Sequence, residues 1–313
     1  MLVDLNWGPT IVPSSSCEYW CIDRHQFNSS HSCTYRDMQK RDSLHYRPAL
    51  GTFQGNWSMD VAHFGSFILP DVQFVEFDRI DGIFTYYQGY DGVLGFAAFD
   101  PKIPNKPWNP IRVLVAERLL DRNLFALLLP ANGADGNSTD GELHLGAVPE
   151  SYTDSDRFFV TVPINPRSYK VDAWLGNMAF ISYQYGYEQF NNSFIAFSLV
   201  DLPLLLPTEH ANMINAAINA HAGTPVDCNK RSIFPNITLD VGGSEPLVLT
   251  GFDYVYMDGG KGCKSMVSTI DNLEEERFRN VTVFFGSVAL QRWMTVFDLD
   301  EKEIRLTTRD HDP

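Results

Sequence analysis

The sequence predicts a mainly β chain that folds as two similar lobes with a few short helices. Apolar and polar residues alternate with a period of two in many short stretches, which is typical of half-buried strands. The 22 glycines and 18 prolines are scattered along the chain, so turns interrupt it at short intervals. One pattern of polar residue, proline, apolar pair and glycine also occurs in each half, which indicates an internal duplication.

The strands and helices follow from these patterns. Residues 158–162 and 237–241 alternate between apolar and polar side chains and predict strands. A helix is predicted after Pro207, where apolar residues recur at a spacing of four, and Gly223 is expected to end it. A shorter helix is predicted at about residues 111–120.

Composition excludes several classes of protein. With 44% hydrophobic and 20% charged residues, the chain lies outside the range of disordered proteins. The formal net charge of −15 repels phosphate backbones, so nucleic acid is not expected as a partner. No apolar run approaches the roughly 20 residues that cross a bilayer, so no membrane span is predicted.

The duplication is seen in the spacing of particular residues. In the first half, Asp4 lies nine positions before Pro13, and in the second half Ser198 lies nine positions before Pro207. About 90 residues after each polar residue comes an apolar pair followed by glycine. These two groups are Val93-Leu94-Gly95 and Phe284-Phe285-Gly286.

The five cysteines are consistent with two disulfides and one remaining thiol. Cys17 and Cys21 would close a very small loop, Cys228 and Cys263 a long one, and Cys33 is left over. A zinc site is the alternative, but its spacing matches no common zinc finger, and we predict no metal site. It would use Cys17, Cys21, His25, His31 and Cys33.

Six Asn-x-Ser/Thr sequons indicate passage through the secretory pathway. We therefore expect a glycoprotein that is secreted or lies in the lysosomal lumen, although no signal peptide is visible in the first residues. The acceptor residues are Asn28, Asn56, Asn137, Asn191, Asn236 and Asn280.

Several motifs occur together in one order along nearly the whole chain. They are Val12-Pro13 with the Cys17 and Cys21 pair, His25-Gln26-Phe27-Asn28, Tyr90-Asp91-Gly92-Val93-Leu94-Gly95-Phe96, Leu143-His144-Leu145-Gly146, the Cys228 and Cys263 pair, and Gly286-Ser287 to Thr295-Val296-Phe297-Asp298. With these motifs the sequence resembles the pepsin family of aspartic peptidases. The resemblance implies an all-β, bilobal, pepsin-like acid protease fold with two pseudo-symmetric lobes, a substrate cleft between them and a β-hairpin flap.

The resemblance also divides the chain. Residues 1–157 are expected to form the amino-terminal lobe, with the Asp4 loop and the flap, and residues 158–313 the carboxy-terminal lobe. The chain begins at the Asp4 loop itself, so we expect the first strands of the family to be missing. In the flap, the family's tyrosine aligns with Pro48, while Tyr46 lies two positions away, and Gly51 keeps a hairpin plausible.

Peptide hydrolysis in this family, as the resemblance implies, uses one Asp from each lobe in an Asp-Thr/Ser-Gly loop and needs no cofactor. Two carboxyl groups so close cannot both ionise, so they share one proton, and one acts as base on water while the other acts as acid. The glycine brings a backbone N–H to the carboxyl group, and the hydroxyl helps to orient it.

This sequence departs from that pattern in both lobes. Asp4 stands at the position of the first acid, but Leu5 and Asn6 replace the hydroxyl residue and the glycine. Ser198 aligns with the second acid. Asp201 is the alternative second acid, but it lies only six positions before Pro207, and this reading needs a deletion in the loop.

We therefore predict a degenerate, pepsin-like peptidase that has lost its catalytic dyad. It would be a secreted monomer that binds a peptide or protein ligand in the interlobe cleft. An active acid endopeptidase with an Asp4/Asp201 dyad is the alternative function. A structural glycoprotein without a cleft ligand is a third.

Overall fold

The computed structural model describes residues 1–17, 21, 23–46, 51–82, 89–100, 109–130, 141–153, 159–200, 203–220, 225–257, 262–270 and 276–308. Strands dominate the described chain, which confirms the predicted all-β class. The chain forms two compact units, and the predicted limit between residues 157 and 158 lies outside the described residues. Unit 1 comprises Met1–Leu119, Ser168–Ala173 and Glu274–Arg277, and unit 2 comprises Leu120–Arg167, Trp174–Leu273 and Phe278–Pro313.

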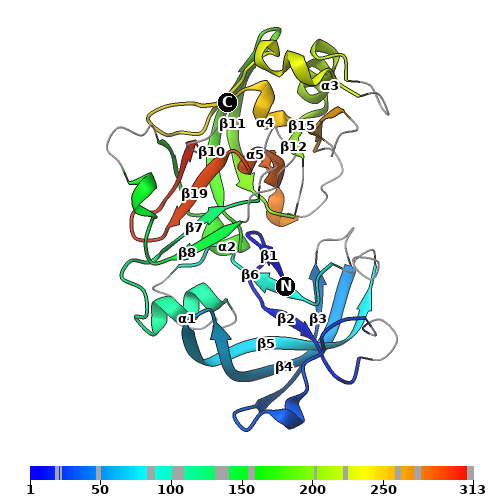
Figure 1. The fold of residues 1–313 in the computed structure, drawn as a ribbon, viewed down its shortest axis with the longest axis vertical. Helices are drawn as coiled ribbons and strands as arrows, with labels where there is room; N and C mark the ends of the chain where they lie inside the picture. The colour runs from blue at the N-terminus through cyan, green and yellow to red at the C-terminus, as the bar shows by residue number, and fades with distance from the viewer. Residues whose placement is uncertain are drawn as a thin grey trace. The chain divides into compact units, whose positions relative to one another are not determined.

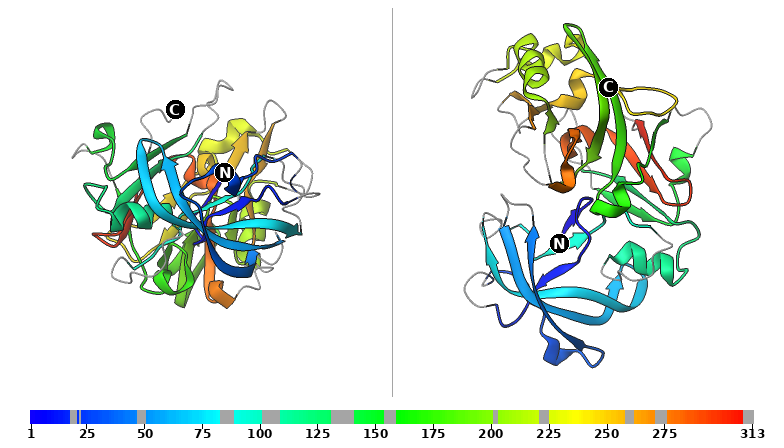
Figure 2. Two further views of the ribbon diagram at one scale, coloured as in Figure 1. Left: turned by 90° about the horizontal axis from the view of Figure 1, so that it is seen from below. Right: turned by 180° about the vertical axis from the view of Figure 1, so that it is seen from behind.

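Unit 1 is built on a six-stranded sheet in the order β1-β6-β2-β5-β4-β3. Two long neighbouring strands, β4 and β5, curve through it (Figures 1 and 2). The strands are β1 (Leu2–Asp4), β2 (Ile11–Pro13), β3 (Arg36–Tyr46), β4 (Gly51–Phe64), β5 (Phe67–Asp81) and β6 (Val93–Gly95). The helices are η2 (Ser29–His31), α1 (Pro110–Ala116), α2 (Ser168–Val171) and η6 (Glu276–Phe278), whose last residue belongs to unit 2.

In unit 1, the segment that connects β1 to β2 crosses over β6, which lies between these two strands in the sheet. β1 runs parallel to β6, with Asp4 opposite Gly95, and β2 runs antiparallel to β6 on its other side. The connection from β1 to β2 therefore passes over the end of β6. A Cβ atom on Gly95 would lie only 2.2 Å from the carbonyl oxygen of Gly8, so this close crossing requires glycine.

Unit 2 contains a seven-stranded sheet in the order β14-β13-β10-β11-β18-β12-β17, a five-stranded sheet in the order β8-β7-β19-β20-β9, and the pair β15-β16. The strands are β7 (Leu124–Leu128), β8 (Glu142–Leu145), β9 (Val160–Pro163), β10 (Leu175–Tyr183), β11 (Gly186–Phe197), β12 (Leu204–Leu206), β13 (Ile237–Asp240), β14 (Leu247–Leu249), β15 (Val255–Met257), β16 (Cys263–Ser265), β17 (Val267–Thr269), β18 (Val281–Phe285), β19 (Trp293–Asp298) and β20 (Glu303–Thr308). The helices are η4 (Glu150–Tyr152), α3 (Thr208–Ala217), η5 (Cys228–Ile233), α4 (Gly251–Tyr254) and α5 (Ser287–Leu290).

Unit 2 repeats the crossing of unit 1. β11 runs parallel to β18, with Phe197 opposite Phe285, and β12 pairs antiparallel with β18 on the other side. In both units the second strand of the crossing also runs parallel to a further strand, β5 in unit 1 and β17 in unit 2. The repeated spacing in the sequence thus corresponds to a repeated strand topology.

Both helices predicted from the sequence form, but each ends earlier than expected. α1 starts at Pro110, with the Asn109 side chain accepting the Ile111 N–H at 2.9 Å as an N-cap. It ends at Ala116 instead of near residue 120, because Arg118 adopts the left-handed conformation with φ of 54°. α3 ends at Ala217 before left-handed Asn219, while the predicted stop, Gly223, lies outside the described residues.

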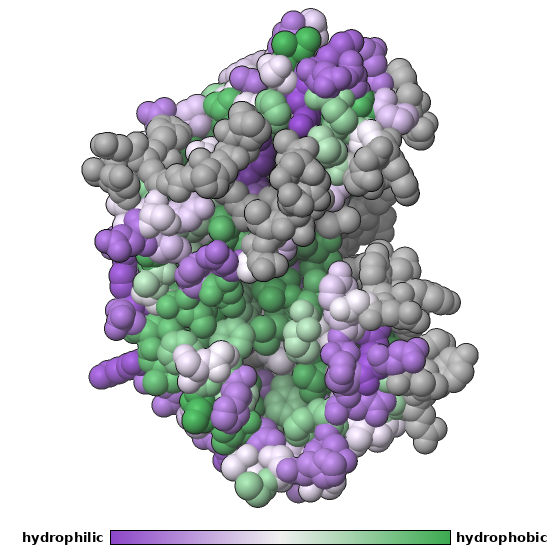
Figure 3. Space-filling view, in the orientation of Figure 1, coloured by the Kyte–Doolittle hydropathy of each residue, from purple (hydrophilic) through white to green (hydrophobic). Residues whose placement is uncertain are grey.

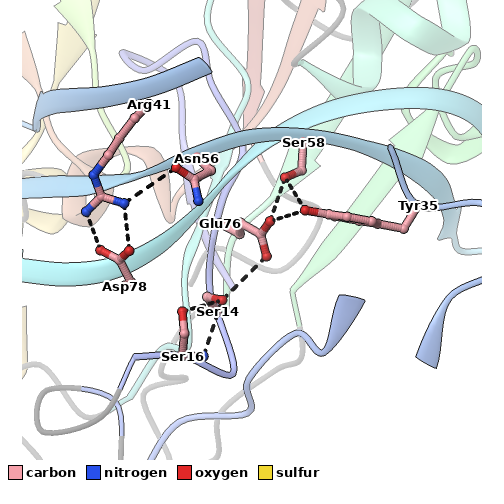
Figure 4. Close-up of polar contacts among 8 residues, drawn as sticks. All are labelled: Ser14, Ser16, Tyr35, Arg41, Asn56, Ser58, Glu76 and Asp78. Carbon is pink, nitrogen blue, oxygen red and sulfur yellow. Dashed lines mark hydrogen bonds and ion pairs between the residues drawn. The ribbon is translucent and has the colours of Figure 1, made fainter. Parts of the chain in front are cut away.

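A buried carboxyl group joins three parts of unit 1 (Figure 4). Glu76 of β5 accepts hydrogen bonds from the Tyr35 hydroxyl at 2.5 Å, the Ser58 hydroxyl at 2.7 Å and the Ser14 hydroxyl at 3.4 Å. Burial raises the pKa of Tyr35, and its hydrogen bond to Glu76 raises it further. Burying a carboxyl group without hydrogen-bond partners would destabilise the fold, and these three hydroxyl groups supply the partners.

Both predicted disulfides are present, Cys17–Cys21 in unit 1 and Cys228–Cys263 in unit 2. The first uses two of the thiols that the alternative zinc site would need, so that alternative is wrong. Cys33 has a free thiol, as expected once the other four cysteines are paired, and it is exposed.

The surface carries apolar as well as charged residues (Figure 3). In unit 1, apolar residues reach the surface around α1, and the exposed large side chains of this unit include Ile68 and Leu119. Among the described helices, none has the length and apolar character needed to cross a membrane.

Candidate active site

Asp4 ends β1 and is completely buried. Its carboxyl oxygen Oδ1 accepts the backbone N–H of Asn6 at 2.8 Å, and Oδ2 accepts the hydroxyl of Tyr46 at 2.7 Å. Its backbone carbonyl accepts the N–H of Phe96, the residue after Gly95, at 2.8 Å. The backbone donor that the resemblance implies for the family's glycine is therefore supplied here by Asn6.

The loop after Asp4 is tied to a distant part of the chain. Arg277 of η6 donates from Nη1 to the carbonyl oxygen of Asn6 at 2.6 Å. The same guanidinium lies 6.0 Å from the ring centre of Trp7, within the range of a cation–π contact. Sequence reasoning did not identify Arg277, because no local pattern connects residue 277 to the start of the chain.

Tyr46 is the hairpin residue that reaches Asp4. It ends β3 opposite Gly51, the first residue of β4, and its side chain is completely buried. Its ring lies edge-on to Trp7, with centres 4.9 Å apart, and 5.8 Å from the ring of Phe53. Pro48, the other residue predicted for the flap, lies outside the described residues.

Gly51 has a structural reason to be glycine. Its φ of 138° is rarely adopted by other residues, and a Cβ atom there would lie 2.0 Å from the carbonyl oxygen of Asp81. The first residue of β4 therefore packs directly against the last residue of β5.

Ser198 follows the strand in unit 2 that corresponds to β1. It is completely buried, and its backbone N–H donates to the carbonyl oxygen of Phe285 at 3.0 Å. Gly286 follows Phe285 as Gly95 follows Leu94, so Ser198 lies at the place in this crossing that Asp4 has in unit 1. Asp201, the alternative acid, lies outside the described residues.

The Asp91 motif of unit 1 is held by the segment after the first disulfide. The backbone N–H of His25 donates to Asp91 Oδ1 at 2.9 Å, and the His25 ring lies 3.1 Å from Oδ2. Arg24 donates to the backbone carbonyl of Tyr90. The hydrogen bond from the His25 backbone lowers the pKa of Asp91, with a smaller contribution from the His25 ring, against the opposing effect of burial.

Asp91→Asn is expected to lower the stability of unit 1 by about 1 kcal/mol near neutral pH, since Asp91 is partly exposed. A carboxyl group with a lowered pKa stabilises the fold above its unfolded pKa of about 3.9, and this contribution is lost as the pH falls through the lowered value. Denaturant unfolding of both proteins from neutral to acid pH measures the difference. A difference that persists unchanged below about pH 2 would contradict this assignment.

The sequons lie in different settings. Asn28 accepts the Ser30 backbone N–H at 3.1 Å and the Ser30 hydroxyl at 2.7 Å in an exposed turn. Asn56 lies within β4 beside Arg41 of β3, and its sequon hydroxyl, that of Ser58, is buried against Glu76. Asn191, Asn236 and Asn280 are exposed, and Asn137 lies outside the described residues.

No group of three or more His, Cys, Asp or Glu side chains in the described ranges is arranged to hold a metal ion.

Comparison with known proteins extends the resemblance seen in the motifs. The family model for eukaryotic aspartyl protease matches residues 7–309. The vacuolar aspartic protease of Candida albicans is 26% identical over 312 residues, which cover 98% of this chain and 71% of that protein. Cathepsin D of Gallus gallus is 26% identical over 302 residues, covering 94% and 73%, and pepsin A of Rhinolophus ferrumequinum is 23% identical over 305 residues, covering 96% and 74%. The chain belongs to the eukaryotic aspartyl protease family.

Proposed function

We propose that this protein is a pepsin-like peptidase homologue that binds peptides or proteins without cleaving them. One observation supports this most directly: Ser198 comes one residue after Phe197, which pairs with Phe285, and Asp4 comes one residue after Val3, which pairs with Leu94 in the other crossing. An alcohol cannot share a proton with a carboxyl group in the way that a second carboxyl group does. The pair that would act as base and acid is therefore incomplete.

The loss of one member of this pair is expected to be severe. General acid–base catalysis contributes about 10²- to 10⁴-fold to rate, and Asp4 alone has no opposing acid to protonate the intermediate. Leu5 also brings no hydroxyl next to Asp4, so the oriented carboxyl group of the family is only partly retained.

We further propose a monomeric glycoprotein of the secretory or lysosomal lumen. Two disulfides, which are stable in oxidising compartments, and exposed sequon asparagines such as Asn280 support this location. Peptide mapping before and after removal of N-linked glycans tests the modification, and sedimentation tests the oligomeric state.

The test of function uses the purified full chain, with an active cathepsin D as positive control. Denatured globin and fluorogenic peptides are incubated at about pH 3 to 5, with and without pepstatin. No pepstatin-sensitive cleavage is expected, whereas a statine-containing peptide is expected to bind, as measured by calorimetry. Pepstatin-sensitive cleavage that is abolished by both Asp4→Asn and Asp201→Asn would instead establish the active alternative.

A further inference from the structure

One histidine of unit 2 is buried between a hydroxyl group and a carboxyl group. This residue, His210, lies in α3. Its ring nitrogen Nδ1 lies 2.9 Å from the hydroxyl oxygen of Tyr183, and Nε2 lies 2.5 Å from Oε2 of Glu188. Tyr183 is buried at the end of β10, whereas the side chain of Glu188 on β11 is half exposed. These contacts join α3 to the β10–β11 hairpin.

The register of the hairpin explains why both groups face α3. Tyr183 pairs with Gly186, so Glu188 and Phe190 lie on the same face of the hairpin as Tyr183. The ring of Phe190 lies edge-on to that of His210, with 6.2 Å between their centres. The ring of Tyr183 lies across Gly186, where an added Cβ atom would meet it at 2.3 Å. The close fit of Tyr183 over this glycine holds its hydroxyl against His210.

The two partners determine where the protons of His210 lie. A carboxylate only accepts hydrogen bonds, so in the neutral ring Nε2 carries the proton and Nδ1 accepts from the Tyr183 hydroxyl. A protonated ring donates from both nitrogens, and the hydroxyl must then donate to another acceptor. Sδ of Met213 lies 3.4 Å from this hydroxyl and can take that bond. His210 can therefore gain a proton in its buried position without the loss of a hydrogen bond.

The ionisable groups beside His210 are acidic. They are Tyr183 of β10, Glu188 of β11 and Glu209 of α3 itself. The strands β12 and β17, which pack against α3, contain no ionisable side chain. Burial raises the pKa of Tyr183, and the charges of Glu209 and Glu188 raise it further, so this hydroxyl keeps its proton. A positive charge on His210 is therefore in direct contact with one carboxylate and near a second.

We propose that His210 is a proton-operated clamp, which binds α3 to the β10–β11 hairpin more tightly in acid than at neutral pH. Protonation turns the hydrogen bond from Nε2 to Glu188 into a contact between opposite charges, which is stronger. Histidines of unfolded chains take up a proton near pH 6.5, so this gain is present at pH 5.5 and absent at pH 8. The clamp acts on the stability of unit 2 and does not depend on peptide binding.

Hydrogen exchange of the α3 amides at pH 8 and pH 5.5, corrected for the pH dependence of the chemical step, measures opening of the clamp. In the full chain, α3 is expected to open about threefold less often at pH 5.5. Glu188→Gln keeps an acceptor oxygen but removes the charge, so the difference is expected to disappear.

Glu142→Gln is the matched control for loss of a charge. Glu142 lies 2.7 Å from Nε2 of His144, also in unit 2, and its side chain is 55% exposed, close to the 50% of Glu188. Because this pair lies outside α3 and its hairpin, the control is expected to keep the full difference between the two pH values in α3.

A second measurement needs no substitution. The NMR shifts of the ring nitrogens show which of them carry protons, and in His210 we expect Nε2 alone at pH 8 and both at pH 5.5. A ring that stays neutral at pH 5.5 overturns the clamp, and so does equal opening of α3 at both pH values. A pH effect in α3 that persists in Glu188→Gln also overturns it.

Discussion

Gly95→Ala is expected to lower the stability of unit 1 by about 3 kcal/mol, because a side chain at this position meets backbone that has no room to move. A Cβ atom would lie 2.2 Å from the carbonyl oxygen of Gly8 and 2.5 Å from that of Trp7. Relief of these contacts would lift the loop from β6 and break the hydrogen bonds that join Asp4 to Phe96 and Trp7 to Ala97.

Guanidinium unfolding followed by tryptophan fluorescence measures this loss. Gly89→Ala is the matched control, since a Cβ atom there meets nothing within 4 Å and its φ is not in the left-handed region. The control is expected to change stability by no more than about 0.5 kcal/mol. If Gly95→Ala unfolds at the same denaturant concentration as the control, the close crossing described above is wrong.

Asp298→Ala is expected to cost about 3 to 5 kcal/mol, because it leaves charged and polar partners without an acceptor. Asp298 is completely buried at the end of β19. Its Oδ2 accepts from Arg122 at 2.8 Å and from Arg305 at 3.4 Å, and its Oδ1 accepts the backbone N–H groups of Asp300 and Glu301 at 3.0 Å each.

Two further variants separate the charge of Asp298 from its role in the turn. Asp298→Asn keeps one acceptor oxygen for the turn and is expected to cost less than Asp298→Ala. Arg122→Ala removes a side chain that is 46% exposed and is expected to cost about 1 kcal/mol or less. Thermal unfolding of the three variants measures this order, and a loss from Arg122→Ala as large as that from Asp298→Ala would contradict it.

The Thr-Val-Phe-Asp motif therefore has a structural explanation. All six residues of β19 are buried, and this strand lies between β7 and β20 in the five-stranded sheet. Its aspartate closes the turn to β20. A motif that served in the sequence to recognise the family thus stabilises the fold of unit 2.

The sequence predicted those features that depend on spacing along the chain. The nine-residue interval from Asp4 to Pro13, repeated from Ser198 to Pro207, corresponds to one strand crossing in each unit. Period-two alternation identified β13, with Ile237 and Leu239 buried, because alternate side chains of a half-buried strand face the core.

Contacts between distant segments could not be predicted in this way. Arg277 reaches the Asn6 carbonyl from the other half of the chain, and Tyr46 reaches Asp4 from the end of a hairpin. The carboxy-terminal end of α1 was also predicted too late. Arg118 adopts the left-handed conformation and ends the helix there, and no feature of the sequence near α1 predicts this conformation for an arginine.

The crossing of unit 1 also sets an order of events during synthesis. Leu2–Asp4 pairs with Val93–Gly95, about 90 residues later in the chain. At a translation rate of roughly 5 to 20 residues per second, the first strand waits on the order of 5 to 20 s before its partner is made. Nascent chains stalled before and after residue 95 should therefore differ sharply in protease resistance, and chaperones have this interval in which to hold the unpaired edge.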